Sequence, residues 1–311
     1  PAVLTTTAGS LILLLGFHGA FLPLLIGRLC VGAAVGMAMS SGAAWIKELS
    51  THVHIGAKRS SIALSSGFAL APGIAGLTAQ YLPWPTVLPY FFHIALALAV
   101  VPLVWMVPER RSTSARSTRR PFFPTSLLTP RYLHVVAYAP WVFGTVTTTF
   151  VFLPSQLSEH LDRPILVAGL MAMLTMGSGV IIQQLAGRIR MTPFHGMVLA
   201  ALGMGLCLTI IAAAHHSWAV ALLPVAAIVM GCSYGIGMLT GLAETQAIAH
   251  PDQLGAATGV FYSLTYLGFF APFILSLLGP AVGYSTAFIL GLVVAALTAG
   301  WLRMKGRGSR G

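Results

Sequence analysis

Ten apolar runs, most of them about twenty residues long, constrain this chain more than any other feature. About 20 apolar residues is the length that carries an α-helix across the hydrocarbon core of a bilayer. Only 7% of the residues are charged, against roughly 25% in soluble domains, so the chain lacks the polar surface of a water-soluble fold. We therefore predict an all-α polytopic membrane protein. The predicted spans are approximately 1–17, 21–46, 60–80, 86–107, 132–153, 164–184, 194–214, 218–245, 255–279 and 283–302.

A basic polar segment at residues 108–131 separates four of these spans from the other six. It carries six arginines and one acid, and its four prolines and its run of Ser and Thr disfavour a regular packed helix. We predict that it is a solvated linker between two halves. The predicted domains are a remnant N-terminal half at 1–107, the linker, a six-helix half at 132–303 and a basic tail at 304–311.

The distribution of Lys and Arg predicts which side of the membrane the linker occupies. If the linker is cytoplasmic, fifteen basic residues lie on its side, and Arg163 alone lies on the opposite side. The positive-inside rule therefore places the linker and both chain ends in the cytoplasm, and we expect a plasma (inner) membrane location. The net charge of +11 then reflects orientation, and we predict no nucleic-acid partner.

Two features recur six spans apart and indicate an internal repeat. Glu48 and Glu244 each lie near the cytoplasmic end of a span, and the pair Ala71-Pro72 recurs as Ala271-Pro272 in a second Gly-rich span. A repeat of six spans leaves two missing before the first. We therefore expect an original twelve, of which ten are present.

Several motifs resemble those of the major facilitator superfamily. Arg28 followed by Gly32 is similar to the motif of the family's fourth helix, and Val107–Glu109 resembles the close of its sixth. The third span resembles the antiporter motif of the fifth helix, with two of that motif's four glycines replaced by alanine. Its matching residues are Gly67, Ala71, Pro72, Ala75 and Gly76. The resemblance implies a two-half helical bundle of the drug/proton-antiporter type, lacking the first two helices.

The resemblance also suggests which residues face the substrate. It implies that Arg28 is a substrate or proton-relay contact, and the alternative is a structural arginine satisfied by neighbouring carbonyls. The family's seventh and tenth helices line the central cavity. They correspond to the fifth and eighth spans here, and the alternative for both is ordinary helix packing. The implied cavity residues are Tyr138, Trp141, Thr145, Tyr234 and Met238.

Small residues and charged pairs have structural roles in this interpretation. Gly32 and Gly36 permit close helix packing, and Pro72 should bend its helix. We expect cytoplasmic ion pairs that form a gate: Glu48 with Arg59, and Glu244 with Arg188 or Arg190. Proton coupling through Glu244 is the alternative.

The sequence has no pattern typical of catalysis. It contains no Gly-rich nucleotide loop, no Cys/His ligand set and no nucleophile–base arrangement, so we expect no metal, no cofactor and no enzymatic activity. The expected partners are the lipid bilayer, a small-molecule substrate and a proton, and the expected state is monomeric.

Three functions remain open from the sequence. The first is proton-coupled efflux of small amphipathic molecules by alternating access. The second is transport of a sugar or an organic anion, with Arg28 binding the anionic group. The third is an inactive fragment or a membrane interaction protein that does not transport.

Overall fold

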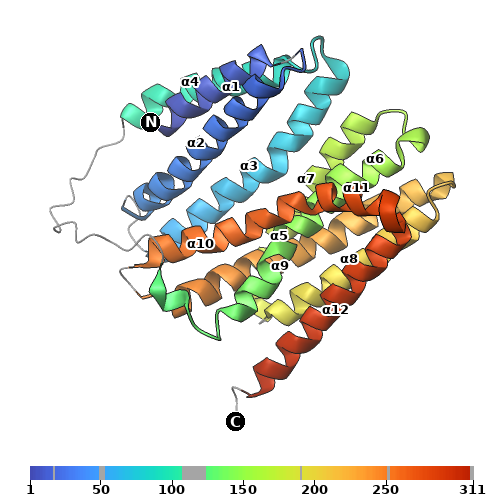
Figure 1. Ribbon diagram of the computed structural model, residues 1–311. Helices are drawn as coiled ribbons and strands as arrows, with labels where there is room; N and C mark the ends of the chain where they lie inside the picture. The colour runs from blue at the N-terminus through green and yellow to red at the C-terminus, as the bar shows by residue number, and fades with distance from the viewer. Residues whose placement is uncertain (17, 49–52, 107–123, 190, 251–252, 309–311) are drawn as a thin grey trace. The chain divides into compact units, whose positions relative to one another are not determined.

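The computed structural model contains only helices and connecting loops among the residues that it describes, which confirms the all-α prediction (Figure 1). The described backbone leaves out residues 17, 49–52, 107–123, 190, 251–252 and 309–311. Side chains at 39–41, 43–48, 53–65, 186–188, 254 and 305–308 also lie outside the description. The helices form two compact units. Unit 1 comprises Pro1–Leu64 and Ile74–Arg116, and unit 2 comprises Ser65–Gly73 and Ser117–Gly311.

The first four helices supply unit 1: α1 (Ala2–Leu15), α2 (Phe21–Glu48), most of α3 (Val53–Tyr81) and α4 (Leu88–Trp105). Helix α1 packs against both α2 and α4. Glycines bring α1 and α2 close together, because a Cβ at Gly27 would lie 2.6 Å from Leu13 Cγ. On the other side of α1, Ser10 Oγ and His93 Nδ1 of α4 lie 2.9 Å apart. The buried hydroxyl of Ser10 on α1 thus has a hydrogen-bonding partner on α4.

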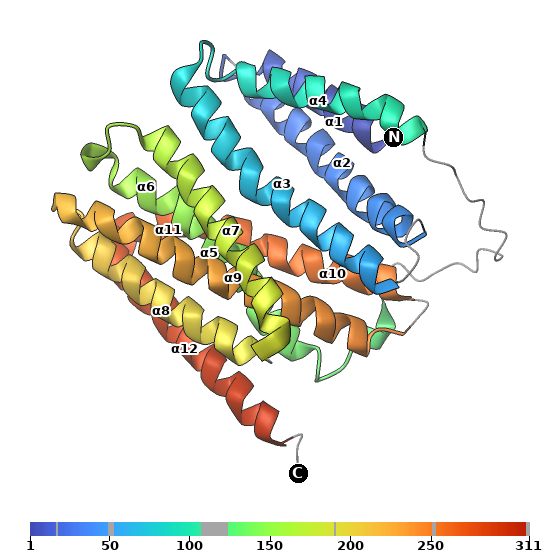
Figure 2. The same ribbon diagram turned by 180° about the vertical axis from the view of Figure 1, so that it is seen from behind.

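Unit 2 is organised around α9 (Leu223–Ile248), which packs against α5, α7 and α8 (Figure 2). Glycines on its α7 side make that approach possible: a Cβ at Gly231 or Gly235 would overlap backbone atoms of Thr175 or Gly179. The other long helices are α5 (Leu133–Thr147), α7 (Pro164–Ile189), α8 (Pro193–Ala212), α10 (Leu254–Tyr266), α11 (Ala271–Val282) and α12 (Tyr284–Gly308). Short pieces are η1 (Thr125–Leu127), η2 (Thr148–Phe152), α6 (Leu153–Gln156), η3 (Ser158–His160), η4 (Ser217–Leu222) and η6 (Leu267–Phe270).

Two predicted spans are not single regular helices. The π-helical turn η2 follows α5 within the first of them, and the 3₁₀ turn η6 separates α10 from α11 in the other. Pro272 lies in the first turn of α11, where its missing N–H costs no helical bond. Pro72, in contrast, lies inside the continuous helix α3. The two Ala-Pro pairs that suggested a repeat therefore have different local structures.

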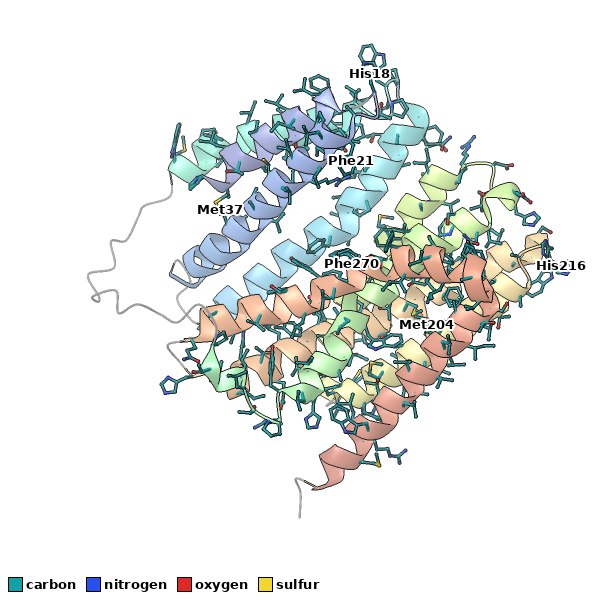
Figure 3. All side chains as sticks on the ribbon, in the orientation of Figure 1. His18, Phe21, Met37, Met204, His216 and Phe270 are labelled. Carbon is teal, nitrogen blue, oxygen red and sulfur yellow. The ribbon has the colours of Figure 1, made fainter. Side chains whose placement is uncertain are left out.

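Membrane-spanning character is clear for most of the predicted spans. Eight stretches of the described chain are long and apolar enough to cross a bilayer, and α1 is a shorter apolar helix. Apolar side chains such as Phe21 (75% exposed) and Phe270 (59%) project from the helices (Figure 3), as expected where a helix faces lipid. Helix α3 begins at Val53 and α12 continues to Gly308, beyond the predicted ends at 60 and 302. Hydropathy marks the bilayer edge, whereas backbone hydrogen bonding continues through polar residues.

The described end of the linker, residues 124–131, differs from the prediction of a solvated segment. Leu127 of η1 is only 3% exposed and packs with Tyr132 and Val135 in the core of unit 2. The backbone N–H and the hydroxyl of Ser126 both donate to Oε1 of Gln253, at 3.2 and 2.7 Å. The arginine and proline content of the linker does not indicate that Leu127 packs in the core at this end.

Adjacent leucines test this packing. Leu127→Ala should destabilise the protein by about 2–4 kcal/mol, because it removes buried methyl groups and leaves a cavity. Leu128 is 71% exposed, so Leu128→Ala should change the free energy of unfolding by no more than about 0.5 kcal/mol. Reversible denaturation in detergent measures both, and limited proteolysis should cut the linker end faster in the Leu127 variant only. Equal effects of the two substitutions would contradict the packing of Leu127 in the core of unit 2.

Candidate functional site

An aromatic cluster in unit 2 joins α5, α9, α10 and η6 around the ring of Phe143. That ring is 1% exposed and stacks on Phe269 with centroids 4.6 Å apart and planes 19° apart. Tilted contacts at 5.7 and 5.4 Å join it to Tyr234 and Tyr266. Tyr262 lies 6.3 Å from Tyr266, one turn earlier on α10. Offset and tilted ring pairs at these separations are the favourable arrangements.

Three phenol groups converge in this aromatic cluster. Tyr266 of α10 packs against the apolar cluster that contains Tyr234, across the α9–α10 contact. Tyr262 and Tyr266 are half-buried, and Phe269 is 45% exposed, whereas Tyr234 is 3% exposed. The α10 side of the cluster is therefore partly exposed, and the α9 side supports it. Gly179 of α7 makes room for the Tyr234 ring, which a Cβ there would overlap.

The sequence analysis found Tyr234 but missed the α10 part of this cluster. Tyr262, Tyr266 and Phe269 follow spacings of four and three, which place them on one helical face. That periodicity was a usable signal.

Two of the three α5 residues predicted to line a substrate cavity are buried within unit 2. Tyr138 is 2% exposed and Thr145 is 0% exposed. Thr145 donates its hydroxyl to the Val142 carbonyl at 3.1 Å, inside its own helix. Met238 is half-buried and packs beside these residues. In this conformation these side chains offer little surface to a substrate.

Tyr138 and Trp141 line a cavity of about 10 Å³ between α5, α8 and α9. That volume holds about one water molecule, so it is not a substrate pocket. Ser233 also lines it and donates to the Gly196 carbonyl at 2.8 Å. The Tyr138 hydroxyl finds no hydrogen bond of good geometry in the described structure. The Thr240 hydroxyl lies near it but donates its own proton to Ile236 O at 2.7 Å.

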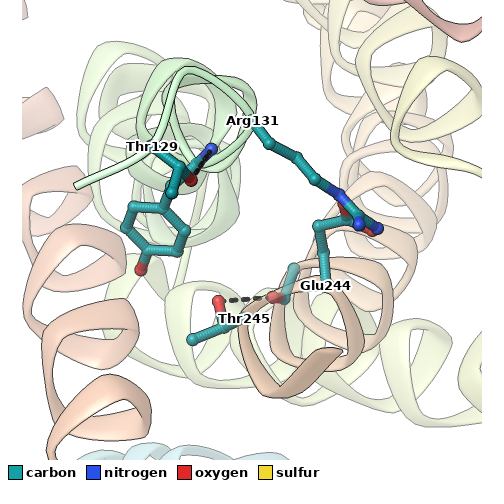
Figure 4. Close-up of polar contacts among 6 residues, drawn as sticks. Thr129, Arg131, Glu244 and Thr245 are labelled. Atoms are coloured by element: carbon teal, nitrogen blue, oxygen red, sulfur yellow. Dashed lines mark hydrogen bonds and ion pairs between the residues drawn. The ribbon is translucent and has the colours of Figure 1, made fainter. Parts of the chain in front are cut away.

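The ion pair observed at Glu244 joins α9 to the end of the linker. Arg131 Nε donates to Glu244 Oε1 at 2.7 Å (Figure 4), and this contact raises the pKa of Arg131 above its ordinary value. Arg131 was not one of the predicted partners. The side chains of Arg188 and Arg190 lie outside the described residues, so pairing with them stays a prediction. The same holds for Glu48 with Arg59.

The Arg131–Glu244 pair should contribute little to stability, because both side chains are exposed, at 60% and 34%. Exposed pairs are worth about 0.2–1 kcal/mol. Glu244→Gln should therefore lower the free energy of unfolding by about 0.5 kcal/mol, and the loss should shrink in high salt. A double-mutant cycle with Arg131→Gln measures the coupling energy. A coupling far above 1 kcal/mol would contradict this.

The described side chains contain no group of three or more His, Cys, Asp or Glu that could hold a metal ion. The Phe and Tyr side chains of the aromatic cluster can stack, make apolar contacts and form hydrogen bonds through the phenols.

A sequence profile described as the Major Facilitator Superfamily matches residues 1–271, most of this 311-residue chain. The chain belongs to the major facilitator superfamily.

The fold of this major facilitator is also similar to that of a solved structure, a mutant of the nucleoside transporter NupG. The TM-score is 0.69, the sequence identity is 12%, and the match covers 97% of this chain and 82% of that one. At this identity the likeness concerns the fold. No curated protein sequence matches the chain. Membership and fold together make the protein an integral membrane protein and a secondary transporter, and transporters of this superfamily are generally not enzymes.

Most of the residues that carried the resemblance lie in α2 and α3, and Val107–Glu109 lie outside the described residues. Arg28 is exposed, within the apolar stretch Phe21–Ala38. A charge within an apolar membrane span is costly if it faces lipid. The role of Arg28 as a substrate or relay contact remains a prediction. Within unit 1, a Cβ at Gly32 or Gly36 would meet no atom within 4 Å. The close approach of α1 and α2 uses Gly9 and Gly27 instead.

The antiporter-like segment of this major facilitator is helical throughout. Gly67 and Ala71 are exposed, Pro72 and Ala75 are half-buried, and Gly76 is buried. These five motif residues are glycine, alanine or proline, so they offer backbone shape and no titratable group. A role in sealing the substrate passage stays a prediction.

Proposed function

We propose that this transporter exports small amphipathic molecules with a flat apolar part, in exchange for protons. The observation that carries the proposal is the aromatic cluster, in which the partly exposed rings of Tyr262, Tyr266 and Phe269 lie beside the buried rings of Phe143 and Tyr234. Ring faces bind flat apolar surfaces, and phenols bond the polar groups of the same ligand.

The charge of the aromatic cluster supports a neutral or cationic substrate. Its members are Phe and Tyr, which carry no formal charge at pH 7. Aromatic faces attract a cation by about 0.5–2 kcal/mol, and an anion gains nothing comparable there. The antiporter-like segment from Gly67 to Gly76 supports exchange with protons. The excess of Lys and Arg on one side supports a cytoplasmic location for both chain ends.

Vesicles test the proposal directly. The purified full chain is reconstituted with an imposed pH gradient, and movement of ethidium, a flat amphipathic cation, is followed by fluorescence. We expect uphill ethidium movement that stops when an uncoupler collapses the gradient. Flux equal to that of protein-free vesicles would reject ethidium-type transport, and flux that persists with the uncoupler would reject proton coupling.

Nucleoside transport is a second candidate. The solved structure that resembles this fold is of a nucleoside transporter, and a nucleobase is a flat ring that the aromatic cluster could stack on. Adenosine should then compete with ethidium and should itself be carried. The anion alternative predicts instead that an aromatic carboxylate is carried and that Arg28→Gln abolishes its transport alone. The substrate that the vesicles accumulate decides among the cationic, nucleoside and anionic alternatives.

A further inference from the structure

A groove of about 860 Å³ runs along the surface of unit 2 between α8 and α12, which lie side by side in both views (Figures 1 and 2). The volume falls within the range of about 300–1,000 Å³ that is typical of ligand sites. Among the described side chains that line it, only Thr209 and Arg303 are polar. The groove therefore suits an apolar ligand, and it is separate from the aromatic cluster.

The groove depends on glycines that helix packing does not require. A Cβ at Gly205 or Gly300 would meet no atom within 4 Å. Other glycines of the same two helices differ: a Cβ at Gly203 would run into the Met230 side chain, and one at Gly291 would lie 3.3 Å from Met204 Sδ. Residues 205 and 300 are thus small where the space beside them is open.

One end of the groove is positively charged. The Arg303 guanidinium lies 5.5 Å from the centre of the Phe194 ring, and both residues line the groove. Phe194 is in the first turn of α8, whose N-terminus adds partial positive charge at this end. The chain that follows Arg303 contains Lys305, Arg307 and Arg310. None of the described side chains that line the groove is acidic.

The length of α8 indicates the depth of this end in the membrane. Its 20 residues span about 30 Å, the thickness of the hydrocarbon core. The first turn of α8, and Arg303 beside it, therefore lie at the level of the lipid headgroups. The apolar groove matches the acyl chain of a phospholipid, and the arginine at headgroup depth matches its phosphate.

We propose that this groove binds an anionic phospholipid, with an acyl chain along α8 and α12 and the phosphate on Arg303. Arginine can hold a phosphate with two parallel N–H bonds, and the basic end attracts the headgroup's net negative charge. A second copy that docks groove to groove is a less suitable occupant, because the described lining offers no acid to Arg303.

Native mass spectrometry of the full chain in detergent tests the proposal, with dioleoyl phosphatidylglycerol and dioleoyl phosphatidylcholine as probes. We expect one tightly retained phosphatidylglycerol per chain, bound about fivefold more strongly than phosphatidylcholine. Arg303→Gln should reduce phosphatidylglycerol binding to the phosphatidylcholine level. Arg163→Gln, a change of an exposed arginine outside the groove, should have no effect.

Filling the groove tests the acyl-chain part separately. Gly205→Phe with Gly300→Phe should weaken retention of both lipids, because the new rings occupy the open space. Leu297→Phe is the matched control, on α12 and 68% exposed but outside the groove. Equal binding of the two lipids, or unchanged phosphatidylglycerol binding in Arg303→Gln, would overturn the proposal. So would a protein dimer that forms at the groove and excludes lipid. If the double variant does not fold, the Arg303 comparison still decides.

Discussion

Replacing Gly231 with alanine should prevent stable folding of unit 2 or cost at least about 3 kcal/mol, the upper end of the usual overpacking penalty. A Cβ at this position would overlap the carbonyl oxygen of Thr175. The obstacle is backbone, which cannot rotate away as a side chain can. Helices α7 and α9 would have to separate along their whole contact. The packing of α7 on α9 would be lost as a result.

Gly205→Ala is the matched control, because the same added methyl group meets open space on α8. It should leave stability unchanged or raise it by up to about 1 kcal/mol, since alanine favours helix over glycine. The measurements are the yield of monodisperse protein and the free energy of unfolding in detergent. Similar behaviour of the two variants would show that α7 and α9 are not held as closely as the structure has them.

Much of the fold was predictable because the bilayer limits the possibilities. A long apolar run must be helical to satisfy its backbone in lipid, so the spans and their order follow from the apolar pattern. Breaks in helices were not predictable in this way. The turn at Leu267–Phe270 precedes a proline, yet Pro72 in a similar context lies inside one helix. Both stretches are apolar, and hydropathy alone does not show where a helix breaks.

The candidate site was predictable only in part, for a related reason. Periodicity identifies a helical face but not what covers it. Tyr138 and Tyr234 share polar or aromatic faces with their neighbours, and the structure covers both with other helices of unit 2. Glu244 illustrates the same limit for charges. Its observed partner, Arg131, lies 113 residues away in the chain, whereas the sequence suggested arginines on the loop before α8.

Loss of the ring at Tyr266 should lower transport efficiency about tenfold if the aromatic cluster binds the substrate, because one ring contact contributes about 0.5–1.5 kcal/mol. Tyr266 touches Phe143, Tyr262 and Phe269, so Tyr266→Ala removes the centre of the reachable wall. Tyr266→Phe keeps the ring and removes only the hydroxyl.

Three variants therefore separate stacking, hydrogen bonding and general damage. For ethidium, stacking should dominate, so Tyr266→Phe should retain most of the activity that Tyr266→Ala loses, with the change in KM rather than in the maximal rate. Phe273→Ala is the control, because Phe273 is 66% exposed on α11 and makes none of the cluster's ring contacts. It should transport like the unmodified protein.

If Tyr266→Ala matches Phe273→Ala in vesicles of equal protein content, the aromatic cluster is part of the packing and the substrate binds elsewhere. If Tyr266→Phe fails as badly as Tyr266→Ala, the phenol is the decisive contact. That result would favour a substrate recognised mainly by its hydrogen-bonding groups, as a nucleoside would be.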